Sequence, residues 1–238
     1  MFKEYTKVHK NVKNVKNVKI QKMQKAQTDI IAFLLIIAMA VIIVSLTFFW
    51  ATPLIEQTRD EYAAQKLRGQ LLELCSAIKT VANEQGALST QFEIPKGTLA
   101  LLTLEENTSV LKLSGQYKLA NPAPQKVLFG SNQIDISGKS LPENFVSFNP
   151  IPLGEEPCLL VERGALEFFL YLVPLNISNG SWNECYRIIL IPGEQAAAGT
   201  GQKIINLIWT GENITNDINI GGTLCNKTIS QLVEFTIR

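Results

Sequence analysis

The chain has 238 residues, of which 46% are hydrophobic and 18% are charged, and its formal net charge at neutral pH is +1. This length leaves room for one ordinary domain with a real core, and the single long apolar run excludes a polytopic membrane protein. Residues 1–26 carry a net charge of +7 and the rest of the chain −6. Because this acidic remainder lacks the basic face of a nucleic-acid-binding protein, we expect no nucleic-acid partner.

The basic leader, residues 1–26, has a lysine at nearly every third position and repeats the triplet Asn-Val-Lys. A period of three does not keep the lysines on one helical face, and their mutual repulsion predicts a disordered, solvated leader. Two functions stay open for it. The lysines suit anionic lipid headgroups, and they also suit retention of the N-terminus in the cytoplasm.

An uncharged run follows the leader, from Ile30 to Ala51, with only Ser45 and Thr47 as polar residues. A helix of this length measures roughly 33 Å, and a bilayer's hydrocarbon core is about 30 Å thick. The run therefore predicts a single transmembrane helix, with residues 86–238 outside the cell. A cleaved secretory signal peptide is the alternative, but its apolar region would be unusually long, and Phe49 would occupy a position that needs a small residue.

The helical pattern continues beyond the membrane run, with a kink expected at Pro53. Apolar residues then recur at steps of four and three on one face: Leu67, Leu71, Leu74, Ile78 and Val81. Gly86 is a natural helix stop. A helix over residues 27–85 would be roughly 88 Å long. Its outer half must therefore pack against the protein's own domain or against a neighbouring helix.

The sequence pattern changes over residues 86–238, where short runs of β-branched and aromatic residues alternate with clusters of Gly, Pro, Asn and Ser. This pattern predicts an all-β, sandwich-like or barrel-like ectodomain, and an α+β fold for the chain. We expect strands at Leu99–Leu104, Ser109–Leu113, Lys126–Gly130, Gln133–Ser137, Asn144–Phe148, Cys158–Arg163, Ala165–Leu172, Cys185–Ile191, Lys203–Trp209, Asn216–Ile220 and Leu232–Ile237. A short helix is the alternative at Ala165–Leu172.

All four cysteines, Cys75, Cys158, Cys185 and Cys225, follow the membrane run and form no Cys-x-x-Cys motif. Three pairings are open to four cysteines, and the sequence alone does not choose among them. Disulfides are chemically permitted if this part of the chain is extracytoplasmic. Our preferred pairing is Cys185–Cys225 within the β-domain and Cys75–Cys158 between the helix and that domain, with buried free thiols as the alternative.

The predicted ectodomain contains few residues of the kinds that catalyse reactions or bind metal ions. The only histidine, His9, lies in the leader, and the cysteines lack zinc-finger spacing. Neighbours along a strand point to opposite faces, so the pairs Glu105-Glu106 and Glu155-Glu156 do not share a site. The chain also lacks the glycine-rich phosphate-binding motifs. We expect no enzyme activity, no cofactor and no metal; a membrane-anchored carboxylate hydrolase stays as a minor alternative.

Five Asn-x-Ser/Thr sequons follow the membrane run, and all of them are external in the predicted topology. They begin at Asn107, Asn176, Asn179, Asn213 and Asn226. One or two sequons are expected by chance in an Asn-rich domain. Five favour a glycosylated surface protein.

The junction of leader and helix reads Lys22-Met-Gln-Lys-Ala-Gln-Thr-Asp-Ile-Ile-Ala-Phe. This junction resembles the class III signal peptide of archaeal type IV pilin-like proteins and archaellins. The resemblance implies cleavage between Ala26 and Gln27 by a prepilin-type signal peptidase, which leaves the apolar run attached. Ile31 stands fifth in the mature chain, where many pilins carry glutamate.

The resemblance also implies a function. Members of that family are structural subunits of cell-surface filaments used in adhesion or motility, and they assemble with copies of themselves or related pilins through the N-terminal helix. The expected localisation is a single-pass membrane protein with its C-terminal domain outside, and an extracellular filament after processing. The alternative function is a monomeric, membrane-anchored extracellular binding module with a pocket in the β-domain.

Overall fold

The structure is a computed structural model. It describes residues 2–103, 109–115, 117, 126–130, 150–152, 155–164, 167–177 and 183–238, with side chains from Thr28 onward. The chain forms two compact units, Met1–Glu56 and Gln57–Arg238. The first unit is helical, and the second holds the end of the same helix together with all the described strands.

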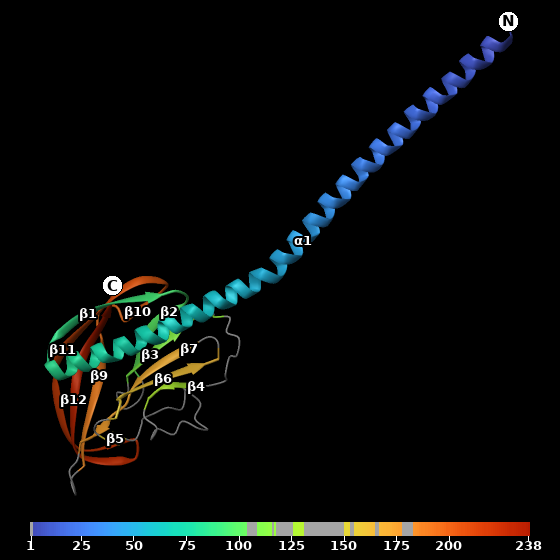
Figure 1. The fold of residues 1–238 in the computed structure, drawn as a ribbon. Helices are drawn as coiled ribbons and strands as arrows, with labels where there is room; N and C mark the ends of the chain where they lie inside the picture. The colour runs from blue at the N-terminus through green and yellow to red at the C-terminus, as the bar shows by residue number, and fades with distance from the viewer. Residues whose placement is uncertain are drawn as a thin grey trace. The chain divides into compact units, whose positions relative to one another are not determined.

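Helix α1 spans Phe2–Glu84 and continues through Pro53 (Figure 1). The backbone of the basic leader is therefore helical, and our expectation that it is disordered is wrong. Residues 2–52 contain neither proline nor glycine, and lysine and glutamine are good helix formers. Extension of a helix costs far less than its nucleation, so the apolar run supports helix on its N-terminal side as well.

The C-terminus of α1 ends one residue earlier than the sequence suggested. Gln85 takes the left-handed conformation that ends the helix, with a φ of 54°. The N–H of Gly86 donates to the carbonyl of Val81 at 3.3 Å, which is the six-to-one bond of a Schellman motif. The residue that ends the helix is therefore Gln85, and not Gly86 as we expected.

The second unit contains two six-stranded sheets, and it confirms the α+β class of the chain. In order across the sheet, sheet I consists of β1 (Ala87–Ile94), β11 (Gly201–Ile220), β12 (Thr223–Ile237), β9 (Glu184–Pro192), β8 (Leu175–Asn176) and β5 (Ile151–Pro152). Sheet II consists of β10 (Ala197–Ala198), β2 (Thr98–Thr103), β3 (Ser109–Ser114), β7 (Glu167–Leu172), β6 (Cys158–Arg163) and β4 (Lys126–Phe129). The pairs β9–β12 and β5–β8 are parallel, and the other pairs are antiparallel.

Most of the expected strands that fall within the described residues lie within a residue or two of observed ones; the exceptions are β1, the two-residue strands β5, β8 and β10, and the β11–β12 hairpin. Strand β1 was not expected, although Leu88, Phe92 and Ile94 occupy alternate positions on one of its faces. The ambiguous segment Ala165–Leu172 contains strand β7. The expected strands Gln133–Ser137 and Asn144–Phe148 lie outside the described residues.

The hairpin formed by β11 and β12 is longer than expected. The segments Lys203–Trp209 and Asn216–Ile220 belong to one 20-residue strand, and a β-bulge just before Gly211 lets the pairing with β12 continue between them. Trp209 pairs with Val233 and Gly211 with Leu232, which leaves Thr210 as the extra residue. The hairpin turns at Gly221 and Gly222, both with positive φ, in the two-residue loop that such a turn favours.

The second unit has a core to which α1 and both sheets contribute. Its large, fully buried side chains include Leu67, Leu71, Leu74 and Ile78 from α1, Phe92 and Phe235 from sheet I, and Phe168 from sheet II. The helical face that we expected from the sequence is thus the face that packs. Burial of each such side chain stabilises the folded state by about 1.5–3 kcal/mol.

A second cluster covers the other face of sheet II, with Val110, Val161, Phe169 and Tyr171 among its members. Strands β6 and β7 are therefore buried on both faces. This explains why their sequences are continuously apolar and do not alternate. In the first cluster, the Tyr117 hydroxyl donates a hydrogen bond to the carbonyl of Lys96 at 2.9 Å, and burial raises the pKa of Tyr117 to about 12.

Candidate functional site

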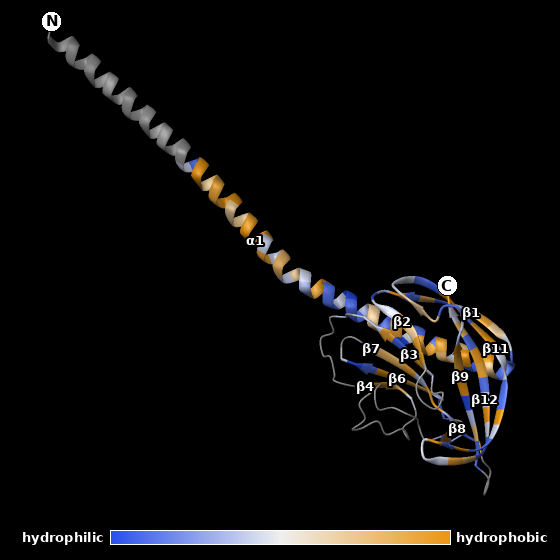
Figure 2. Cartoon of the chain, turned by 180° about the vertical axis from the view of Figure 1, so that it is seen from behind, coloured by the Kyte–Doolittle hydropathy of each residue, from blue (hydrophilic) through white to orange (hydrophobic). Residues whose placement is uncertain are grey.

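The apolar segment of α1, Ile30–Ala51, is the main candidate site. Its large side chains are exposed, from 45% for Ile37 to 78% for Phe49, and no described residue of the segment is buried. Figure 2 shows this part of α1 as almost continuously hydrophobic. By length and composition the helix can cross a membrane. A helix that is apolar all round needs lipid or other protein around it.

The hydroxyl groups near the end of this segment are bonded within the helix. Thr47 Oγ1 donates to the Ile43 carbonyl at 2.8 Å, and Thr52 Oγ1 donates to the Phe48 carbonyl at 2.7 Å. An unbonded hydroxyl is costly in a hydrocarbon environment. These two bonds let the threonines lie in such an environment at little cost.

The C-terminal end of the apolar segment has the composition of a membrane interface. Phe48, Phe49 and Trp50 are all strongly exposed, and aromatic residues of this kind gather where lipid meets water. Pro53 follows and has no N–H, so the carbonyl of Phe49 lacks its usual helical donor. Interfacial water can satisfy that carbonyl, whereas the middle of a bilayer cannot.

The part of α1 beyond residue 57 is fixed to the β-strands and loops of its own unit by ion pairs. Arg68 Nη2 lies 2.5 Å from Glu162 Oε2, and Lys79 Nζ lies 3.0 Å from Glu156 Oε1. Two further pairs join Lys66 to Glu93 and Lys96 to Asp60. The Asp60 side chain is only 2% exposed, so its pairing matters more than that of the surface groups.

Helix α1 also covers the outer edge of β1. In the amide orientation that satisfies both partners, Gln70 donates to the carbonyl of Glu93 at 3.0 Å and accepts from its N–H at 2.9 Å. An edge strand otherwise presents unpaired backbone groups that attract other strands. The edge of sheet I is thus partly closed at β1.

The four cysteines form two disulfides with the pairing that we expected, Cys75–Cys158 and Cys185–Cys225. The first joins α1 to the start of β6, and the second joins β9 to β12. Glu156 lies beside Cys75 and Cys158, and these three residues have the composition of a metal site. Because both sulfur atoms are committed to the disulfide, this cluster is a covalent link and not a metal centre.

The remaining residues expected from the sequence are scattered. Ala26 and Gln27 lie in the helical backbone of α1, and their side chains are outside the described part of the chain. The same holds for the whole of Asn107 and Asn179. Asn213 is exposed on β11, whereas Asn176 and Asn226 are half-buried. The sequons of Asn213 and Asn226 lie on the neighbouring strands β11 and β12, where Thr215 of the first is paired with Thr228 of the second.

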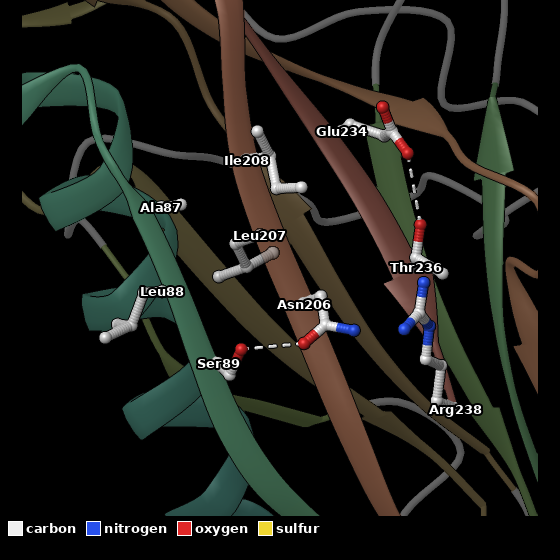
Figure 3. A pocket seen from close by; sticks show the side chains of 9 residues that line it. All are labelled: Ala87, Leu88, Ser89, Asn206, Leu207, Ile208, Glu234, Thr236 and Arg238. Atoms are coloured by element: carbon white, nitrogen blue, oxygen red, sulfur yellow. Dashed lines mark hydrogen bonds between the residues drawn. The ribbon is translucent and has the colours of Figure 1, made fainter.

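A shallow groove of about 310 Å³ lies on sheet I (Figure 3). Its lining residues come from β1, β11, β12 and the C-terminus: Ala87, Leu88, Ser89, Asn206, Leu207, Ile208, Glu234, Thr236 and Arg238. Ser89 donates to Asn206 at 2.7 Å and Thr236 donates to Glu234 at 3.3 Å, so much of its polar capacity is used internally. Sequence reasoning missed this groove because it missed β1, although alternate apolar residues marked that strand.

Comparisons with protein-family models, curated proteins and solved structures found no match to this chain.

Proposed function

We propose that this protein is a structural, pilin-like subunit of an archaeal cell-surface filament, used in adhesion or motility, that assembles through its apolar segment. The observation that carries the proposal is the contrast within α1. One part of the helix packs into the core of its own unit, while Ile30–Ala51 is uncharged and has no buried residue.

The apolar segment requires an apolar environment both before and after the proposed assembly. Each of its large side chains would gain about 1.5–3 kcal/mol on full removal from water. Lipid supplies that environment before assembly, and helices of neighbouring subunits supply it within a filament. A repeated head-to-tail contact that does not close into a ring produces a helical filament.

The topology of the proposal follows from charge and redox chemistry. The lysine-rich leader stays in the cytoplasm by the positive-inside rule. A prepilin-type signal peptidase then cleaves between Ala26 and Gln27. The unit with the two disulfides lies outside, in the oxidising environment in which disulfides persist. We infer a sandwich-like arrangement for that unit, supported by the contribution of both sheets to one core.

Mass spectrometry of the mature N-terminus tests the proposal. Trypsin cuts after Lys25, so the unprocessed chain yields a peptide that begins at Ala26 and ends at Arg59. The processed chain yields the same peptide without Ala26, starting at Gln27 or its cyclised pyroglutamyl form. We expect the shorter peptide from native membranes or filaments. Recovery of the leader peptides and the Ala26 form from mature protein contradicts the proposal.

The groove on sheet I supports the second candidate function, a monomeric membrane-anchored binding module. In that case α1 beyond Pro53 is a stalk and the apolar segment stays in lipid. Electron microscopy of filaments sheared from cells, with antibody labelling of this chain, separates the two functions. A filament subunit is labelled along the filament, whereas a monomeric anchor stays with the membrane fraction.

A further inference from the structure

One edge of sheet I is open along part of β11. Strand β1 pairs with β11 only from Ile94, opposite Gly201, to Ala87, opposite Ile208. The pairing ends with the N–H of Trp209, which donates to the carbonyl of Gly86 at 2.9 Å. Over residues 211–220, the described part of the chain places β12 on one side of β11 and no strand on the other.

This open stretch is exposed and has a partly apolar sequence. Ile214 is 53% exposed at its middle, and an open edge of this kind pairs readily with a strand from a second copy. Edges in native proteins are protected by charge and by irregular backbone. Here Glu212 and Asp217 place two acidic residues within the stretch, and Asp217 breaks its regularity with a φ of 53°.

The sequon Asn213-Ile214-Thr215 lies between these two protective features. We propose that Asn213 carries an N-linked glycan that shields the open edge of β11 from pairing with a second copy of the chain. This inference depends on the proposed external location of the second unit, but not on filament assembly. A glycan is large compared with one strand, so a single sugar chain at Asn213 covers much of a ten-residue stretch.

The structure favours Asn213 over the other described sequons. Asn213 is exposed and stands opposite Ser230, whereas Asn226 is half-buried between β11 and β9. Asn226 Oδ1 also accepts the N–H of Asn183 at 3.0 Å, which ties β12 to the start of β9. Asn176 is half-buried in the short strand β8. The amide of Asn213 therefore has the space that an attached sugar needs.

The reaction requires a lipid-phosphate-linked sugar and a membrane oligosaccharyltransferase. Asn213 Nδ2 forms a bond to the anomeric carbon, the bond from that carbon to the phosphate oxygen breaks, and the lipid phosphate leaves with the electron pair. The amide nitrogen gives up one proton to the enzyme. Because Thr215 Oγ1 is buried in the folded unit, the sequon must be read before the β11–β12 hairpin closes.

Glycopeptide mapping of the native protein tests the site. We expect a sugar on the peptide that contains Asn213 and an unmodified Asn226. A bare Asn213 in native protein overturns the proposal, whatever the filament experiments show. The mapping is independent of cleavage at Ala26, so its failure and a failure of the proposed function are distinguishable.

The shielding role is tested with variants expressed in the native host. Thr215→Ala and Asn213→Gln each remove the sequon, and Thr215→Ser is the matched control that keeps it. We expect severalfold stronger lateral association of the two sequon-less variants, measured by light scattering of the purified full chain in detergent. Addition of Ile214→Lys to Thr215→Ala places a charge on the bare edge and should reverse the association.

Two outcomes overturn the shielding role. In one, both sequon-less variants remain as monodisperse as Thr215→Ser. In the other, Ile214→Lys leaves their association unchanged, which means that the contact lies elsewhere. Far-ultraviolet circular dichroism of each variant checks that it is folded, and Asn213→Gln, which leaves the Thr215 hydroxyl in place, keeps the test decisive if Thr215→Ala misfolds.

Discussion

At the scale of single residues, the chain reverses direction at the end of α1 without glycine, the residue that best tolerates the positive φ that this reversal needs. Gln85 holds a φ of 54°, and its side chain is exposed. A non-glycine residue in this region costs about 1–2 kcal/mol because its Cβ approaches the backbone. The Gly86–Val81 backbone bond and the pairing of Trp209 with Gly86 hold Gln85 there.

Replacement of this residue tests the account. We expect Gln85→Gly to raise the free energy of unfolding by about 1 kcal/mol, because glycine takes positive φ without strain and no buried contact is lost. Gln85→Ala is the control: it keeps the Cβ and should give no gain. Denaturant unfolding of the full chain in detergent measures both variants, and an equal response to the two substitutions contradicts the account.

At the scale of elements, α1 is one continuous helix with two environments. Beyond residue 57 its buried face, with Leu67, Leu71 and Leu74, belongs to the core of the second unit. In the first unit Ile30–Trp50 has no buried side chain. The part of α1 beyond residue 57 is thus an integral part of the second unit and contributes directly to its stability.

Two leucines on the same helix provide a matched pair of substitutions. Leu71 is fully buried, and Leu54 is 60% exposed. Leu71→Ala removes buried atoms and leaves a cavity, so we expect a loss of about 2–5 kcal/mol in the free energy of unfolding. Leu54→Ala should leave the unfolding of the second unit nearly unchanged. Similar losses for the two variants would show that Leu71 does not pack in the core.

At the scale of the whole molecule, one chain combines a disulfide-linked β-rich unit with a helix that requires an apolar environment. Lipid and filament core are both apolar, so the same segment serves the proposed precursor and the proposed subunit. Its centre must then be intolerant of charge. An aspartate at the middle of a membrane helix raises the free energy of insertion by the translocon by about 2.5–3.5 kcal/mol.

A charge at Ile42, near the middle of the apolar segment, tests this requirement. We expect Ile42→Asp to reduce membrane insertion and to abolish labelled surface filaments, while the thermal unfolding of the second unit stays unchanged. Ile42→Val, which keeps the residue apolar, should behave as the native chain. The amount of each variant in membranes and in sheared filaments is the measurement. Normal filaments from Ile42→Asp would refute assembly through this segment.

The sequence by itself determined the features that rest on local composition and period. The apolar helix, its packing face from Leu67 to Val81 and the β-rich region all follow from patterns within a few residues. Such patterns report which face of an element is buried, because side chains repeat every 3.6 residues in a helix and every two in a strand.

Only the tertiary structure decided the features that depend on distant partners. Three pairings of the cysteines were open, and packing of α1 against sheet II placed Cys75 beside Cys158 across 83 residues. Strand β1 became visible through its pairing with β11, more than a hundred residues away. The open edge at Asn213 exists only because β1 is shorter than β11. These features depend on which segments meet, and a local pattern does not carry that information.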